Sequence, residues 1–455
     1  TSIYFKDKAI WDCGEKYRSH QGKYPVIFLT FKDVKFDSWG STRNKIYALV
    51  QEEYERHQEL LNSDRLSMYE KGFYKKILDG DANEVELTAS LEKLSKMLAI
   101  HYGTAPIIII DEYDTPIQEG HSKDFYDEII GFMRNFFSGA FKDNRNLSYG
   151  FLTGILRIAQ ESIFSGLNNL TVNSVMDEAY GQYFGFTEQE VYQMLDYYHV
   201  SEKKEELKNW YDGYSFEEVE SVYSPKSVVS CMRLGKLGNY WNQTETFEAL
   251  QIYIDMNFEG LRDDILSMIA GETVPVNTRS FTNDMTTFRT EDDVLTLLIH
   301  LGYLGYRYAD KTVFIPNEEI RSEYVSAIAV SDWGEVSKAL KNSADTLQAI
   351  WQGREEQVAE GIRQAHFETS HLQYNDENAL SYTISLALYA ARNFYTVHRE
   401  LSGGKGFADI VYVPRKRFLD KPALVVELKW DKNAEGAIQQ IKEKEYCRSL
   451  EEYKG

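Results

Sequence analysis

The sequence predicts an α/β protein with a parallel sheet in its first half, a mainly helical middle and a small αβββα module at its end. Two observations support this prediction. Short apolar runs alternate with amphipathic helical patterns over about the first 150 residues, which is typical of a parallel sheet covered by helices. Near the end of the chain, three strand-like segments separated by turns lie between two helical patterns.

Length and charge set the first limits. With 455 residues, and about 150 residues in a typical domain, we expect about three domains, at residues 1–245, 246–350 and 351–455. The 71 acidic residues exceed the 50 basic ones, and the resulting net charge of −21 repels nucleic acids and anionic membranes at long range. A nucleic acid partner must therefore be bound at a local site.

No pattern in the sequence indicates a membrane protein or an oxidising compartment. No apolar run reaches the length of a membrane-spanning helix, and the first residues lack the features of a signal peptide. Cys13, Cys231 and Cys447 have neither the number nor the spacing of a disulfide framework or a zinc knuckle. We therefore expect a cytoplasmic protein without a membrane partner. Because the first residue is Thr1 and not Met, we also expect the chain to begin inside a longer protein.

The first half alternates strand-like and helix-like segments. The run of four isoleucines that ends at Asp111 favours a strand covered on both faces, as in a parallel sheet. Strands are expected at residues 24–29, 106–110 and 147–152, and helices at residues 41–61, 87–100 and 124–141.

Polar residues stand where two of these strands end. Asp111 and Glu112 follow the second strand and Thr153 follows the third, at the sheet edge where ligands of such folds bind. Nucleotide hydrolysis uses this set, because an Asp holds hydrated Mg²⁺, a neighbouring Glu polarises the attacking water and a hydroxyl contacts the γ-phosphate. The alternative is that these acids only cap buried strands at the solvent boundary.

The middle of the chain is predicted to consist of packing helices around one hairpin. Strand-like residues 302–308 and 312–317 follow a helical pattern, which favours a winged-helix-like module. This segment is not basic, so a lid or packing role fits it better than nucleic acid binding. Helices are expected at residues 188–210, 247–270 with an interruption at Gly260, 292–300, 317–330, 336–349 and 355–367.

The end of the chain carries the clearest chemical pattern. Glu427 and Lys429 are two residues apart in a strand, so their side chains share one face of the sheet. Asp409, on a neighbouring strand, completes a small oxygen site for Mg²⁺ or Mn²⁺. Such an ion polarises a phosphodiester and lowers the pKa of a bound water, while a lysine orients the nucleophile or offsets transition-state charge. The alternative is a surface ion pair on an edge strand.

The elements around these residues follow the αβββα order. Glu377 stands at the amino end of the first helix of this module. From His398 onward the chain has 12 basic and 10 acidic residues, so the acidity of the protein belongs elsewhere. The helices are expected at residues 378–394 and 434–453, and the strands at residues 395–401, 407–413 and 423–430.

Several stretches resemble the predicted AAA-ATPase-like family of bacterial proteins: residues 107–116, 151–169, 211–214 and 223–227. The resemblance covers essentially the whole chain and implies a P-loop-type ATPase sheet with a nuclease-like domain at the carboxyl end. It implies that Asp111 and Glu112 are the Walker B acids, with Asp111 as a metal ligand. It further implies that Thr153 is a sensor-type residue and that Arg157 faces a nucleotide phosphate.

One part of that family's pattern is missing. The phosphate loop lies, in the family, upstream of the part that corresponds to Thr1, and Gly-x4-Gly-Lys-Ser/Thr does not occur in this sequence. In the intact family, ATP is held by the backbone N–H groups and the lysine of this loop. We therefore expect this chain, without the first strand and the phosphate loop, to bind ATP weakly or not at all.

The last module resembles the PD-(D/E)xK nuclease superfamily, which has a restriction-endonuclease-like fold, at residues 406–409, 425–429 and 437–442. The resemblance implies that Asp409 and Glu427 are metal ligands and that Lys429 is the catalytic lysine. It places Gln440 beside the site on the last helix. Glu377 matches an acid that some members carry on the first helix.

Two classes of function remain open at this point. The leading hypothesis is a metal-dependent nuclease, acting on DNA or RNA, that is attached to an ATPase-like body. The alternative is a nucleotide-responsive interaction protein whose nuclease-like module only binds. Intact Asp409, Glu427 and Lys429 favour the enzyme, whereas the acidic body and the missing phosphate loop favour the alternative. A homo-oligomer is compatible with both.

Overall fold

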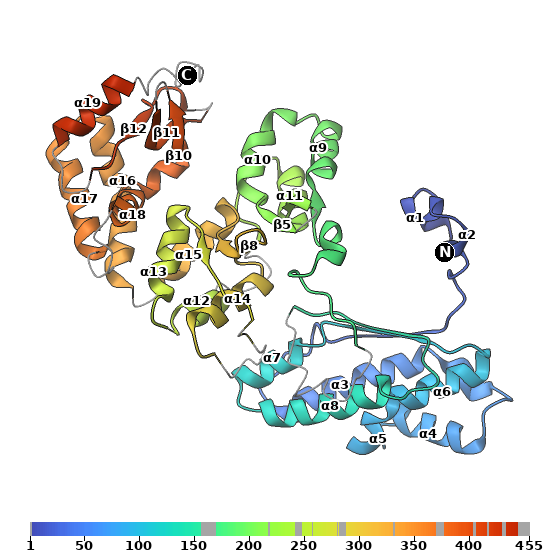
Figure 1. Cartoon of the computed structure of the whole chain (residues 1–455). Helices are drawn as coiled ribbons and strands as arrows, with labels where there is room; N and C mark the ends of the chain where they lie inside the picture. The colour runs from blue at the N-terminus through green and yellow to red at the C-terminus, as the bar shows by residue number, and fades with distance from the viewer. Residues whose placement is uncertain are drawn as a thin grey trace. The chain divides into compact units, whose positions relative to one another are not determined.

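The computed structural model of the chain forms two compact units, each described here by itself (Figure 1). The first unit comprises Thr1–Ser174 with Arg279–Arg289, and the second comprises Val175–Thr278 with Thr290–Gly455. The domain boundaries predicted at residues 245/246 and 350/351 stay predictions. The structure describes residues 2–155, 170–216, 219–241, 248–256, 258–279, 281, 288–330, 333–369, 377–403, 406–415, 418–429 and 434–444.

The first unit contains the predicted parallel sheet. Its strands are β1 (Val26–Thr30), β2 (Ile107–Asp111) and β3 (Tyr149–Leu152), and β2 lies between the other two. Both pairs are parallel, with Thr30 opposite Asp111 in the register of β1 and β2. The carboxyl ends of the three strands therefore meet at one edge of the sheet, as predicted.

Helices account for most of the rest of the first unit. The prediction of one helix at residues 87–100 is corrected to two, α5 and α6, which meet at Ala89. A capping box between Asn83 and Glu86 starts α5 upstream of the predicted boundary. The helices are α1 (Ala9–Asp12), α2 (Glu15–Arg18), α3 (Trp39–Glu55), α4 (Met68–Leu78), α5 (Glu84–Thr88), α6 (Ser90–Tyr102), α7 (Thr115–Ser122) and α8 (Tyr126–Phe141).

The two faces of this sheet differ in burial. Ile108 and Ile110 of β2 are fully buried, whereas on the opposite face Phe28 of β1 is 45% exposed and Phe151 of β3 is 53% exposed. Successive side chains of a strand point to opposite faces, and Figure 1 shows α3, α4, α6 and α8 gathered on one side of the strands. The expectation that β2 is covered on both faces is therefore met on one face only.

The second unit begins with helices and two small antiparallel sheets. The predicted interruption is confirmed, because Gly260 has a φ of 92° and stands at the start of α13. The single helix predicted at residues 188–210 is two helices, since the backbone at His199 is left-handed, with a φ of 57°. The helices are α9 (Glu188–Tyr197), α10 (Lys204–Tyr211), α11 (Pro225–Leu234), α12 (Glu248–Ile254), α13 (Leu261–Ala270) and α14 (Glu291–His300).

The predicted hairpin is present as β8 (Gly305–Arg307) and β9 (Thr312–Phe314), and β7 (Val274–Pro275) joins it in the order β7-β9-β8. Its likeness to a winged helix stays a prediction. A further sheet, in the order β4-β6-β5, was not expected from the sequence, because its strands are too short to show a period. They are β4 (Phe186–Thr187), β5 (Tyr214–Phe216) and β6 (Val219–Tyr223).

The end of the second unit has the predicted αβββα order. Its antiparallel sheet has the order β10-β11-β12, and one face packs on a core of side chains such as Leu347, Leu388 and Tyr395. No helix in the described part of the chain is long and apolar enough to span a membrane. The elements are α15 (Glu318–Val330), α16 (Gly334–Trp351), α17 (Glu355–Thr369), α18 (Glu377–Ala387), β10 (Tyr395–Gly403), β11 (Gly406–Pro414), β12 (Leu424–Val426) and α19 (Ala434–Lys444).

Candidate active site

The strands β11 and β12 bring two acids together at one end of the last sheet. Ile410 of β11 lies opposite Val426 of β12, so Asp409 and Glu427 each stand one residue beyond this pair, at the same end of the ladder. Val425 of β12 belongs to one apolar cluster with Ile441 of α19, and Nε2 of Gln440, also on α19, donates to Oε1 of Glu427. Glu427 therefore faces the last helix.

The strand that was predicted at residues 423–430 ends earlier than expected. β12 stops at Val426, and the backbone N–H of Leu428 donates to Oδ2 of Asp409 at 2.6 Å. The Asp409 side chain thus accepts the hydrogen bond in place of a backbone partner from β11, and the pairing of β11 with β12 ends there. Glu427 and Lys429 lie just past the strand, where the backbone is held by one of the candidate metal ligands.

The Glu427 side chain is only 1% exposed, and its two oxygens have different surroundings. Nζ of Lys429 donates to Oε1 at 2.9 Å, and Nε2 of Gln440 donates to the same oxygen. Oε2 is buried and has no hydrogen-bond partner among the described residues. A buried carboxylate oxygen without a partner costs free energy, and a cation removes that cost.

This donor set fits a hard divalent ion. Mg²⁺ and Mn²⁺ prefer carboxylate oxygens, and Mg²⁺ keeps several waters when the protein supplies one or two carboxylates. Within the described ranges there is no group of three or more His, Cys, Asp or Glu residues that could hold a metal. Asp409 and Glu427 are the two carboxylates at this end of the sheet that could hold such an ion, with water completing the coordination.

Two of the predicted site residues cannot be placed. Glu377 is the first residue of α18, but its side chain lies outside the described part of the structure. Arg157 lies outside the described residues entirely. Lys429 and Gln440 both donate to Glu427, whereas the strand that was predicted to carry Glu427 and Lys429 ends at Val426. The sequence did not indicate that both donors would meet the same oxygen.

In the first unit, Asp111 lies at the meeting point of the three strands. Oγ1 of Thr153 donates to Oδ1 of Asp111 at 2.6 Å, and Oγ1 of Thr30 donates to Oδ2 at 3.2 Å. Thr30 was missed by the sequence analysis. The signal was present, because Thr30 directly follows the first predicted strand, as Asp111 follows the second. Both oxygens of this carboxylate are therefore hydrogen-bonded within the protein.

Glu112 has different partners from Asp111. Its backbone is left-handed, with a φ of 51°, and Oγ1 of Thr115 donates to its Oε2 at 3.3 Å. Non-glycine residues seldom adopt this conformation, and such strained positions concentrate at functional sites. The carboxylate of Glu112 is thus bonded at the start of α7.

A third acid of this segment, Asp114, ties the loop after β3 to α7. Its side chain is buried, and its Oδ2 accepts from Nε2 of Gln118 at 2.9 Å and from the backbone N–H of Ile155 at 3.0 Å. A Cβ at Gly154 would lie 2.4 Å from Oδ1 of Asp114, so only glycine fits there without displacement. The sequence analysis gave Asp114 no role, because a buried structural acid leaves no periodic signal.

Comparisons with known proteins agree with this two-part organisation. Residues 1–164 match the family described as Predicted AAA-ATPase, and residues 377–454 match the PD-(D/E)XK nuclease superfamily. An uncharacterized protein from the vnfD 5′ region of Azotobacter chroococcum mcd 1 is 30% identical over 145 residues, which are 32% of this chain and 28% of that protein. No solved structure matches the chain significantly. The chain therefore combines an AAA-ATPase-like domain at its amino-terminal side with a domain of the PD-(D/E)XK nuclease superfamily at its carboxyl-terminal side.

Proposed function

We propose that the carboxyl-terminal domain is a divalent-metal-dependent nuclease that hydrolyses phosphodiester bonds in DNA or RNA. The observation that supports this most directly is the Glu427 carboxylate. It is buried, it receives two donors on Oε1, and its Oε2 has no partner in the described part of the chain. A carboxylate in this state is suited to binding a cation.

Each residue of the site has a proposed task. Asp409 and Glu427 hold Mg²⁺ or Mn²⁺, which when bound polarises the phosphodiester and activates a water molecule. Gln440 fixes Glu427 by donating to Oε1, which leaves Oε2 available. The ammonium of Lys429, 2.9 Å from Glu427, orients the nucleophile or offsets charge that develops on the phosphate.

The amino-terminal domain is proposed to regulate or move the nuclease in response to a nucleotide. Supporting this is the convergence of Thr30, Asp111 and Thr153 at the carboxyl ends of parallel strands, where nucleotides bind in such sheets. The sequence lacks the Gly-x4-Gly-Lys-Ser/Thr pattern, so ATP binding by this chain is expected to be weak. Asp111 and Thr153 would then act on a bound nucleotide only in a protein that also contains this phosphate-binding loop.

The test is a cleavage assay with single- and double-stranded DNA and RNA in Mg²⁺ or Mn²⁺. Glu427→Gln and Asp409→Asn are each expected to lower the rate by about a hundredfold or more, and EDTA is expected to abolish it. Glu443→Gln is the matched control, because Glu443 is an exposed residue of α19 that bonds Gln439. Cleavage by Glu427→Gln at the parental rate would disprove the assignment, and binding of nucleic acid without any cleavage would favour the interaction-protein alternative.

A further inference from the structure

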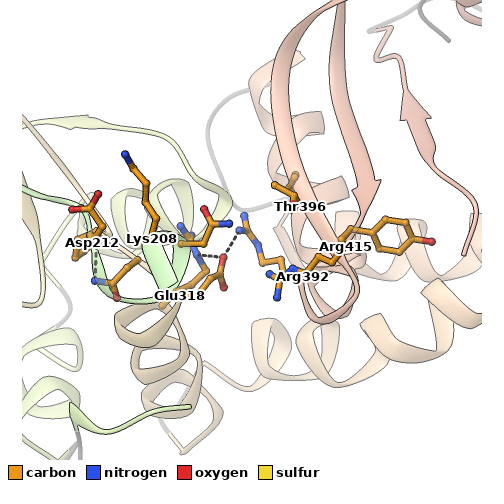
Figure 2. A pocket seen from close by; sticks show the side chains of 13 residues that line it. Lys208, Asp212, Glu318, Arg392, Thr396 and Arg415 are labelled. Atoms are coloured by element: carbon orange, nitrogen blue, oxygen red, sulfur yellow. Dashed lines mark hydrogen bonds and ion pairs between the residues drawn. The ribbon is translucent and has the colours of Figure 1, made fainter. Parts of the chain in front are cut away.

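A second polar site lies in the second unit, away from the candidate nuclease site. It is a pocket of about 280 Å³ (Figure 2). Arg415 follows β11 directly, whereas Asp409 lies six residues earlier on that strand, roughly 20 Å away at the rise of an extended chain. The pocket is lined by Lys208, Asn209, Asp212, Gly213, Pro316, Asn317, Glu318, Arg321, Arg392, Tyr395, Thr396, Val397 and Arg415.

The pocket holds more positive than negative charge. Figure 2 shows Lys208 and Asp212 on one side and Arg392 and Arg415 on the other, with Glu318 between them. With Arg321, the lining has four cationic side chains and two carboxylates. Burial also raises the pKa of Asp212.

Glu318 is the carboxylate at the centre of the charge cluster. Its Oε1 lies 3.0 Å from Nη1 of Arg392 and 3.5 Å from Nε of Arg321. Burial alone raises the pKa of Glu318, but the neighbouring guanidinium groups, including that of Arg415, outweigh burial and hold this pKa below its ordinary value. One carboxylate therefore faces three guanidinium groups, and it balances only one of their charges.

Two of the four cations have structural tasks. Nη1 of Arg321 donates to the backbone carbonyls of Met268 and Ile269, at the end of α13. Nζ of Lys208 is paired at 2.8 Å with Glu188, which is not part of the pocket lining. Arg392, which pairs with Glu318, and Arg415 line the same pocket, where their guanidinium groups can hold an anion.

We infer that this pocket binds the phosphate group of a small phosphorylated ligand through Arg392 and Arg415. Guanidinium groups bind phosphate through paired N–H donors, and the pocket lining has four cationic side chains and two carboxylates. A volume of about 280 Å³ accommodates a phosphate with a small organic part, whereas a nucleic acid needs an extended basic surface. The lining comes from α10 and α15 as well as from β10, so the ligand would join the nuclease sheet to the middle helices.

The test uses the full chain in EDTA, so that its result does not depend on the metal site or on cleavage. Binding of inorganic phosphate, ribose 5-phosphate, ribose and a short oligonucleotide is measured by calorimetry. We expect both phosphates to bind and ribose not to bind. Arg415→Gln should weaken phosphate binding by about tenfold, whereas Glu318→Gln should strengthen it because it removes the competing carboxylate.

Arg363→Gln is the matched control, since Arg363 is an exposed residue of α17 that pairs with Glu360. It should leave binding unchanged, and thermal unfolding of each variant checks that it folds. The inference is overturned if neither phosphate binds, or if Arg415→Gln and Glu318→Gln shift the affinity in the same direction. It is also overturned if only the oligonucleotide binds, because that result would identify an extended nucleic acid surface.

Discussion

Asp111 in the first unit is the last residue of β2, and Glu427 in the second directly follows β12, but their carboxylates have different surroundings. Each oxygen of Asp111 accepts a hydrogen bond from a threonine hydroxyl. In Glu427 both donors meet Oε1, and Oε2 is buried without a partner in the described part of the chain. The first carboxylate is satisfied by neutral groups, whereas the second is left incomplete.

This difference supports the proposal that Glu427, of these two acids, takes part in metal-dependent chemistry. An acid after an apolar strand is compatible with a cap at the solvent boundary, and a fully hydrogen-bonded Asp111 agrees with that simpler role. A buried oxygen without a partner is costly, so its presence at Glu427 supports the proposal that this carboxylate binds a cation. The proposed chemistry therefore rests on the carboxyl-terminal site.

The largest effect is expected when the cationic partner of Glu427 is removed. Lys429→Gln should lower the cleavage rate by about a hundredfold or more, because the ammonium then no longer offsets the negative charge that develops in the transition state. The same change should tighten Mn²⁺ binding, because the ammonium no longer competes with the metal for Glu427. Single-turnover cleavage and a Mn²⁺ titration measure the two quantities.

Lys421→Gln is the control for this experiment, because Lys421 lies in the same module and its ammonium stacks over the ring of Trp351. It should change neither cleavage nor Mn²⁺ affinity. If Lys429→Gln weakened the binding of Mn²⁺, Lys429 would be needed to build the metal site, and the separate tasks proposed for Lys429 and Glu427 would be wrong.

Addition of metal should distinguish the two carboxylates directly. At a Mn²⁺ concentration one hundred times the dissociation constant, a native-state site gains about 2.7 kcal/mol of stability. Slower hydrogen–deuterium exchange in β11 should report this gain, and Glu427→Gln should remove it. Asp111→Asn should leave it unchanged. An equal gain in β2 that Asp111→Asn abolishes would show that the first site also binds metal, and the contrast between the two would fail.

The carboxyl-terminal site could be predicted from the sequence in large part because its signals are local. A strand repeats every two residues, so the spacing of Glu427 and Lys429 predicts that they share one face. The order of the helices and strands around them follows from turns and apolar runs that can be read in sequence. The structure has this order of elements, and Lys429 does contact Glu427, although β12 ends before both residues.

The features that the sequence did not indicate are contacts between residues that are distant in the chain. Thr30 meets Asp111 across 81 positions, and only the strand register brings them together. The early end of β12 depends on the bond from Leu428 to Asp409, 19 positions away. Burial of Glu427 likewise depends on how α19 packs. Periodicity carries no information about such contacts, so the state of each carboxylate could not be predicted.

A change at Gly154, next to Thr153 in the first unit, should lower the stability of that unit and leave the nuclease activity unchanged. Gly154→Ala places a methyl group 2.4 Å from Oδ1 of Asp114 and 2.8 Å from the ring of Tyr113. Because Asp114 is buried and bonded to the next residue of the loop, this overpacking should destabilise the first unit by about 2 kcal/mol. Urea unfolding, with hydrogen–deuterium exchange to localise it, measures the effect. Loss of metal-dependent cleavage without loss of stability would contradict the independence of the two sites.

The smallest expected effects come from the threonines that satisfy Asp111. Thr153→Val should destabilise the first unit by about 1 kcal/mol and Thr30→Val by about 0.5 kcal/mol, because the bond from Thr153 is 2.6 Å long and that from Thr30 is 3.2 Å. Urea unfolding of the two variants and of the double variant measures both. If the two threonine hydroxyls act only as hydrogen-bond donors to Asp111, water should partly replace each lost hydrogen bond, because Thr153 is exposed. If instead addition of Mn²⁺ restored the stability of the double variant, the hydroxyls would be occupying cation positions, and Asp111 would resemble Glu427 after all.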